Sequence, residues 1–131
     1  MYRSKKIDKK PRRRLAIDFD GVIHRYSKGF YDGSLYDIPV PDARRTLINL
    51  RKKWWLYVYT TRARDKKGRQ AVERYLRKYG IPFDEVVGQK PIAFAYIDDR
   101  AITFTDWPST VKKLTAMNQK YLKKLRSVEK S

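Results

Sequence analysis

Two aspartates separated by one residue, Asp18 and Asp20, close the apolar stretch LAIDFD. Side chains two positions apart on an extended chain project to the same side, so both carboxylates can reach one reacting centre. One carboxylate can attack as a nucleophile and form a covalent intermediate, which divides a difficult reaction into two easier steps. The other can protonate a leaving oxygen and then deprotonate a water molecule. The pair therefore indicates carboxylate chemistry at the end of a strand.

Polar residues also follow three further apolar stretches. They are Thr60, Thr61 and Arg62 after residues 54–59, Lys90 after residues 84–88, and Asp98 and Asp99 after residues 93–97. Each set has an ordinary structural explanation by itself, because aspartates often form turns and lysines are commonly solvated. Four such sets in a row are much harder to obtain by chance, and we treat them as one candidate site.

The hydrophobic pattern predicts the elements that must position these residues. Strands are predicted at 15–19, 54–60, 84–88 and 93–98, with 101–104 as a candidate fifth, and helices at 42–53, 65–79 and 109–126. This alternation predicts an α/β fold with a mainly parallel sheet and helices on both faces. Ligands of such sheets bind beyond the carboxyl ends of the strands, so the four polar sets should meet at one edge.

The connecting segments carry signals of their own. Residues 23–41 contain glycines and prolines among several tyrosines, which predicts a loop or small hairpin. Asp42 is expected to cap the helix that follows it. The helix predicted at 109–126 has an apolar seam with lysines over much of the rest. The seam is formed by Val111, Leu114, Tyr121, Leu122 and Leu125.

The order of these polar sets resembles the haloacid dehalogenase-like phosphatase superfamily. The matching segments are LAIDFDGVI, LYVYTTR, GQKP and AYIDDRA, and the resemblance spans residues 14–106. The first and last segments are the most specific. The resemblance implies a single Rossmann-like core and an Mg²⁺-dependent phosphomonoester hydrolase. It is closest in layout to the small stand-alone members of that superfamily.

The resemblance implies a role for each matching residue. Asp18 would be the nucleophile that forms an aspartyl-phosphate, and Asp20 would be the acid/base. Thr60 and Lys90 would bind the phosphoryl oxygens and stabilise transition-state charge. Mg²⁺ prefers carboxylate oxygens and retains several waters. Its implied ligands are Asp18, the backbone carbonyl of Asp20, and the pair Asp98 and Asp99, with Asp99 as the expected direct ligand.

The net charge indicates which kind of binding partner to expect. Lysine and arginine total 32 against 14 acidic residues, which gives a net charge of +18. A field of that size attracts polyanions, with nucleic acid ahead of an anionic membrane surface, although a highly charged soluble surface is the plainer explanation. The absence of cysteine excludes thiolate chemistry and suits a reducing cytoplasm. No apolar run approaches the ~20 residues that span a bilayer.

The expected domain organisation is simple. Residues 1–13 are predicted to be a flexible basic arm, 14–126 one phosphatase domain and 127–131 a short tail. Larger members of the superfamily insert a cap after the first motif or between the second and third. Both segments are short here, and the resemblance therefore implies an open, capless site.

The substrate class rests on analogy. A hydroxyl residue followed at the second position by Arg62, and Arg100 after the fourth motif, resemble polynucleotide 3′-phosphatases. Thr61, Arg62 and Arg100 are therefore predicted to contact substrate, and the predicted substrate is a 3′-phosphorylated nucleic-acid end or a nucleotide. Two alternatives stay open. One is a phosphatase of small metabolites such as sugar phosphates, and the other is a non-catalytic nucleic-acid-binding module on the same fold.

Five residues after the first motif could have either a functional or a structural role. His24, the single histidine, could contact substrate or have a structural or solvated role. The aromatic side chains of the same segment could stack on bases or cover the core. They are Tyr26, Phe30, Tyr31 and Tyr36.

Overall fold

The computed structural model describes residues 12–130 of the chain, so most of the predicted basic arm lies outside the described residues. The chain divides into two compact units, 1–99 and 100–131. The predicted single domain 14–126 spans this division. No helix among residues 12–130 is long and apolar enough to cross a membrane.

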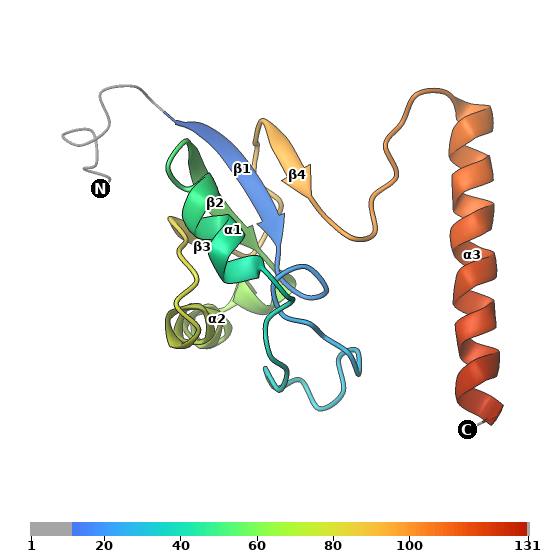
Figure 1. Cartoon of the computed structure of the whole chain (residues 1–131), viewed down its shortest axis with the longest axis horizontal. Helices are drawn as coiled ribbons and strands as arrows, with labels where there is room; N and C mark the ends of the chain where they lie inside the picture. Colours follow the sequence, from blue (N-terminus) through green and yellow to red (C-terminus); the bar gives the residue numbers. More distant parts are fainter. Residues whose placement is uncertain (1–11, 131) are drawn as a thin grey trace. The chain divides into compact units, whose positions relative to one another are not determined.

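The first unit is built on a four-stranded parallel sheet (Figure 1). Its strands are β1 (Arg13–Asp18), β2 (Trp54–Tyr59), β3 (Glu85–Val87) and β4 (Ala95–Ile97), in the spatial order β3-β2-β1-β4. All three strand pairs are parallel. The predicted α/β class with a parallel sheet is therefore confirmed, and the topology is compatible with a Rossmann-like core. Since β1 and β2 are central, their carboxyl ends meet in the middle of one sheet edge.

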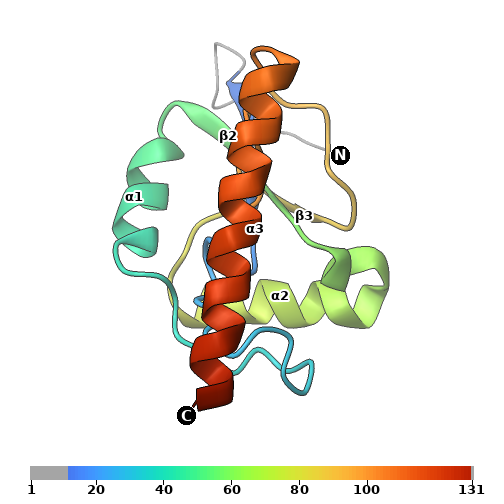
Figure 2. The same ribbon diagram turned by 90° about the vertical axis from the view of Figure 1, so that its right-hand side faces the viewer.

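Two helices pack on the same face of this sheet. They are α1 (Ala43–Leu50) and α2 (Lys66–Lys78), both visible in Figure 2, and a 3₁₀ turn, η2 (Thr61–Arg64), precedes α2. Alternate residues of β1 and β2 join apolar residues of both helices in a single buried cluster, which shows that the helices share a face. The cluster includes Leu15, Ile17, Leu56 and Val58 from the strands with Ala43, Leu47, Val72, Tyr75 and Leu76 from the helices.

The opposite face of the sheet carries a different set of side chains. Trp55, Tyr57 and Tyr59 alternate with the core residues of β2 and therefore point away from α1 and α2. Within residues 12–99, the described helices cover one face, whereas the sequence predicted helices on both. Helical cover of the second face stays a prediction.

The starts of the two helices differ in their capping. Asp65 caps α2 as an acidic residue normally does, because its Oδ1 accepts a hydrogen bond from Gly68 N–H at 2.7 Å. Asp42 stands at the predicted N-cap position of α1, but its side chain does not cap the helix. Its backbone is left-handed at φ 71° and its side chain makes no capping hydrogen bond, since Oδ1 accepts from Arg45 Nη2 at 2.7 Å instead. An effective cap needs extended backbone, and Asp42 lacks it.

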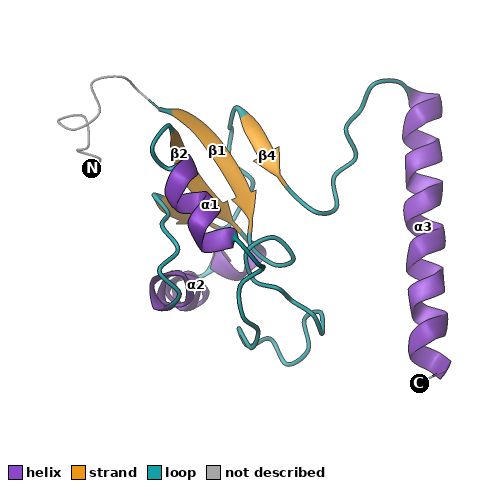
Figure 3. Cartoon of the chain, viewed as in Figure 1, coloured by secondary structure: helices purple, strands orange, loops and turns teal. Residues whose placement is uncertain are grey.

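The connection from β1 to α1 is a long loop, as predicted, and it is drawn in teal in Figure 3. Turns make up most of it, and isolated bridges pair His24 with Asp20 and with Pro39. These bridges hold both ends of the loop beside the end of β1. The loop therefore begins and ends at the sheet edge where the candidate residues were expected.

The second unit contains one helix, α3 (Trp107–Lys130), which begins two residues before the predicted start and continues into the predicted tail. Asp106 caps it by accepting a hydrogen bond from Ser109 N–H at 2.8 Å. The candidate strand at 101–104 is wrong, because these residues form no ladder. Strand propensity expresses the fit to a half-buried pleated surface, and three of these four residues are exposed. The apolar seam of α3 is also exposed: Val111, Leu114, Tyr121, Leu122 and Leu125.

Candidate active site

Three carboxylates converge at the carboxyl ends of β1 and β4. Asp18 is the last residue of β1, and Asp98 and Asp99 follow β4, which pairs with β1 through Ile17 and Ile97. Each of the three offers an oxygen, and these oxygens all lie within 4.8 Å of one another. The parallel register thus brings the first and fourth motifs together. We call Asp18, Asp98 and Asp99 the acidic triad.

The electrostatics of the acidic triad are unfavourable without a cation. Burial raises the pKa of Asp18 to about 6, and the negative charges of Asp98 and Asp99 add to this, against a hydrogen bond from Phe19 N–H that favours the charged form. That bond joins Phe19 N to Asp18 Oδ1 at 2.8 Å. Like charges this close disfavour joint ionisation, and a divalent cation between them would reverse the effect.

The backbone around the triad is shaped for close approach of a carboxylate. Gly21 has a left-handed φ of 87°, and a Cβ atom at this position would collide with the Asp99 carboxylate. The glycine therefore permits both the turn after Asp20 and the position of Asp99. Three carboxylates make a hard-oxygen donor set of the kind that Mg²⁺ accepts. The residues present fit such an ion.

A tyrosine outside the predicted set supports the triad. The Tyr59 hydroxyl donates a hydrogen bond to Asp98 Oδ2 at 2.6 Å, which fixes that carboxylate at the sheet edge. Burial and the neighbouring Asp98 raise the pKa of Tyr59 far above its ordinary value, so the hydroxyl keeps its proton. The register that pairs Tyr59 with Asp18 explains the contact, although no local sequence signal identifies it.

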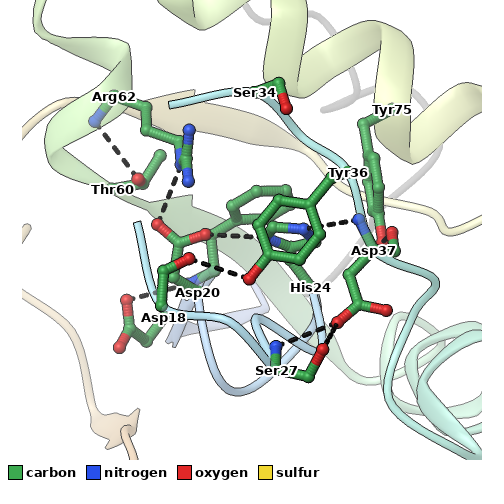
Figure 4. A network of polar contacts seen from close by, with 12 residues as sticks. Asp18, Asp20, His24, Ser27, Ser34, Tyr36, Asp37, Thr60, Arg62 and Tyr75 are labelled. Atoms are coloured by element: carbon green, nitrogen blue, oxygen red, sulfur yellow. Dashed lines mark hydrogen bonds and ion pairs between the residues drawn. The ribbon is translucent and has the colours of Figure 1, made fainter. Parts of the chain in front are cut away.

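Asp20 has an environment opposite to that of the triad (Figure 4). Its Oδ1 lies 2.8 Å from His24 Nδ1, and its Oδ2 accepts a hydrogen bond from Arg62 Nε at 2.9 Å. Burial acts to raise the pKa of Asp20, but the hydrogen bonds from His24 and Arg62, together with the charge of Arg62, outweigh it and lower the pKa. Asp20 is therefore held as a carboxylate, the form that can remove a proton from a water molecule.

His24 is completely buried, which favours the structural reading over substrate contact. Its Nε2 accepts a hydrogen bond from Asp37 N–H at 3.1 Å, so in the neutral ring Nδ1 carries the proton and donates it to Asp20. The ring also stacks on Phe19 and contacts Tyr75 edge-on. The i, i+4 spacing from Asp20 is the sequence signal that could have identified this pair.

The second motif reaches the site through the turn that follows β2. Thr60 is buried at the start of η2, and its hydroxyl accepts a hydrogen bond from Arg62 N–H at 3.2 Å. Arg62 then extends back to Asp20, and its Nη1 donates to Gly33 O at 2.7 Å. Its Nη2 is buried and has no hydrogen-bond partner among the described residues. Thr61 is exposed at the first position of η2.

Lys90 and Arg100 are the other two cationic residues predicted to contact substrate, and they lie in different units of the chain. Lys90 Nζ lies 4.5 Å from the ring centroid of Tyr96 and 6.0 Å from that of Tyr59. Since Tyr59 holds Asp98, these contacts place Lys90 on the side of the sheet edge where the triad lies. Arg100 is the first residue of the second unit, and its contact with substrate stays a prediction.

Comparison with known proteins adds no relative: no family model, curated protein or solved structure matches the chain.

Proposed function

We propose that the chain is an Mg²⁺-dependent phosphomonoester hydrolase of the haloacid dehalogenase type, which acts through an aspartyl-phosphate on 3′-phosphorylated nucleic-acid ends. The observation that carries the proposal is the pairing of two unlike carboxylates at one sheet edge. Asp18 belongs to a triad of negative charges, whereas Asp20, two residues later, is held by His24 and Arg62. A nucleophile beside a cation site and a separate proton carrier are what two-step phosphate hydrolysis requires.

The residues would divide the work as follows. Asp18 Oδ1 is engaged by Phe19 N–H, which leaves Oδ2 as the attacking oxygen. Asp20 would take a proton from solvent and give it to the leaving oxygen as Asp18 bonds to phosphorus. The resulting carboxylate would then remove a proton from the water that displaces Asp18 from phosphorus. Thr60, Lys90 and Arg62 would offer hydrogen-bond donors to phosphoryl oxygens. Mg²⁺, held by the acidic triad, would supply charge neutralisation between the nucleophile and the phosphoryl group.

An open site is part of the proposal. Residues 20–42 contain turns and isolated bridges, and residues 60–89 contain only η2, α2 and β3, which the sheet layer itself requires. A site without a cap admits the end of a polymer. With a net charge of +18, nucleic acid is then a better substrate than a free sugar phosphate.

A phosphate-release screen tests the proposal. We expect release from 3′-phosphorylated oligonucleotides in Mg²⁺, weaker release from the matching mononucleotides and sugar phosphates, and none in EDTA. If about six backbone phosphates contact the protein, kcat/KM for the oligonucleotide should fall about a thousandfold between roughly 50 and 200 mM salt. Preference for the sugar phosphate at every salt concentration would instead favour the metabolite phosphatase. Salt-sensitive binding without phosphate release would favour the non-catalytic module.

A further inference from the structure

The loop between Asp20 and α1 has a defined shape that its sequence maintains. Ser27 N–H and its hydroxyl donate to Asp37 Oδ2 at 2.9 and 2.5 Å, which closes the base of the loop. Tyr36 bridges the interior, since its hydroxyl donates to Gly29 O at 2.8 Å and accepts from Lys28 N–H at 2.7 Å. We call residues 26–36 the aromatic loop. Its shape is held by side chains in place of regular secondary structure.

Two of the four rings in the aromatic loop point outward. Phe30 is 63% exposed and Tyr31 is 62% exposed, so neither covers the core. Tyr26 and Tyr31 both have left-handed backbone, with φ values of 58° and 52°. Such a conformation is uncommon for a bulky residue and is more often maintained where function requires it. The outward rings and the strained backbone both indicate a role beyond packing.

Arg62 connects the outward rings to the candidate active site. Its Nε bonds Asp20, its Nη1 bonds Gly33 O within the loop, and its guanidinium carbon lies 5.6 Å from the ring centroid of Phe30. Lys28 Nζ lies 4.7 Å from the ring centroid of Tyr31. Each exposed ring is therefore accompanied by a cation, and Phe30 is separated from Asp20 by one arginine side chain.

We propose that Phe30, with Tyr31 beside it, is a stacking subsite for the nucleobase next to the phosphate that Asp18 attacks. The inference rests on the proposed function and names how the substrate is recognised. A flat aromatic ring with an adjacent cation matches a base joined to an anionic phosphodiester. A sugar phosphate has no aromatic ring to place there. Stacking on a side chain tolerates any base, so the subsite would select for a base without reading its identity.

The test compares two 3′-phosphorylated oligonucleotides, one with a normal terminal nucleoside and one with an abasic residue in that position. The quantity measured is the ratio of their kcat/KM values with the full chain at fixed salt. We expect the wild type to prefer the base, and Phe30→Leu to lower that ratio by about tenfold. Phe30→Tyr should retain the preference because it keeps the ring, and Tyr31→Leu should lower it less.

The chain offers a matched control at Phe94. This ring is 64% exposed and the guanidinium carbon of Arg13 lies 5.0 Å from its centroid, as Arg62 lies over Phe30, yet Phe94 directly precedes β4 and is outside the proposed subsite. Phe94→Leu should leave the ratio unchanged. Equal use of both oligonucleotides by the wild type, or equal losses for both in Phe30→Leu, would overturn the inference.

Binding separates this inference from the proposed function. Fluorescence anisotropy with labelled forms of the same two oligonucleotides measures affinity without turnover. If no phosphate is released but the chain still prefers the base through Phe30, the hydrolase proposal fails and the stacking subsite stands. If phosphate is released from both at equal rates and both bind equally, the subsite fails and the hydrolase stands.

Discussion

Asp18 and Asp20 lie two residues apart but occupy opposite environments. Burial and the acidic neighbours raise the pKa of Asp18 to about 6, whereas hydrogen bonds from His24 and Arg62 overcome burial and lower the pKa of Asp20. One region gathers like charge, whereas the other satisfies its charge through His24 and Arg62. Two residues of the same type thus acquire different chemistry from what surrounds them.

The largest expected effect is at the triad side of this comparison. Asp18→Asn should reduce Mg²⁺-dependent phosphate release to background, a loss of more than about 10⁴-fold, because an amide cannot attack phosphorus comparably. The measurement is turnover of the purified variant, with its fold checked by circular dichroism. Asp42→Asn, at an exposed aspartate whose carboxylate pairs with Arg45, is the control. Near-normal turnover in Asp18→Asn would show that Asp18 is not the nucleophile.

The corresponding change at the other carboxylate should be milder and depend on the substrate. Asp20→Asn is expected to slow turnover by about 10²- to 10⁴-fold, the usual contribution of general acid–base catalysis. Aryl phosphates with good leaving groups need little protonation, so their first step should lose least. The measurement is turnover across aryl phosphates of graded leaving-group pKa. A uniform loss across that series would contradict the assignment of Asp20 as acid.

His24, which holds Asp20, and Tyr59, which holds Asp98, should contribute different amounts to the free energy of unfolding. His24→Ala should reduce the free energy of unfolding by about 2–4 kcal/mol, because it opens a cavity and removes the hydrogen-bond partner of Asp20 Oδ1 and of the Asp37 N–H. Tyr59→Phe removes one hydrogen bond to Asp98 and should cost about 1 kcal/mol. Urea unfolding measures both values. A larger loss of unfolding free energy in Tyr59→Phe than in His24→Ala would contradict this prediction.

The smallest expected effect is a pH dependence of stability in EDTA. The folded pKa of Asp18, about 6, lies above its unfolded value of 3.8, so the unfolded chain loses this proton first as pH rises. The contribution of Asp18 to stability therefore falls between about pH 4 and pH 6, by about 1 kcal/mol once solvent screening is allowed for. Asp18→Asn should flatten this part of the profile.

The lowered pKa of Asp20 has the opposite sign. Its contribution is present above its unfolded pKa of 3.8 and is lost as pH falls through the lower folded value. Asp20→Asn should therefore lower the unfolding free energy above about pH 4, flatten the loss of stability at more acid pH, and leave the slope from pH 4 to 6 in place. If Asp20→Asn also removed the slope between pH 4 and 6, that titration would belong to Asp20 and not to Asp18.

The positions of the candidate residues along the chain could be predicted well. Apolar stretches that end at Asp18, Thr60 and Asp98 predict strands, and strands alternating with helices predict a parallel sheet whose ends converge. The errors lie where short-range signals are weak. The run 101–104 reads as a strand but forms no ladder in the structure, and Asp42 has the residue type of a cap without the backbone conformation.

Periodicity and residue type alone determined the α/β class, the parallel sheet and the meeting of Asp18 with Asp98 and Asp99. Only the tertiary structure decided the partners of each carboxylate. Arg62 reaches Asp20 across 42 positions of sequence, and Tyr59 reaches Asp98 across 39. Such contacts depend on strand register and on the path of a loop, which local patterns do not encode. The physical reason is that hydrophobic alternation specifies which face a residue takes, whereas hydrogen-bond geometry between distant segments specifies what it touches.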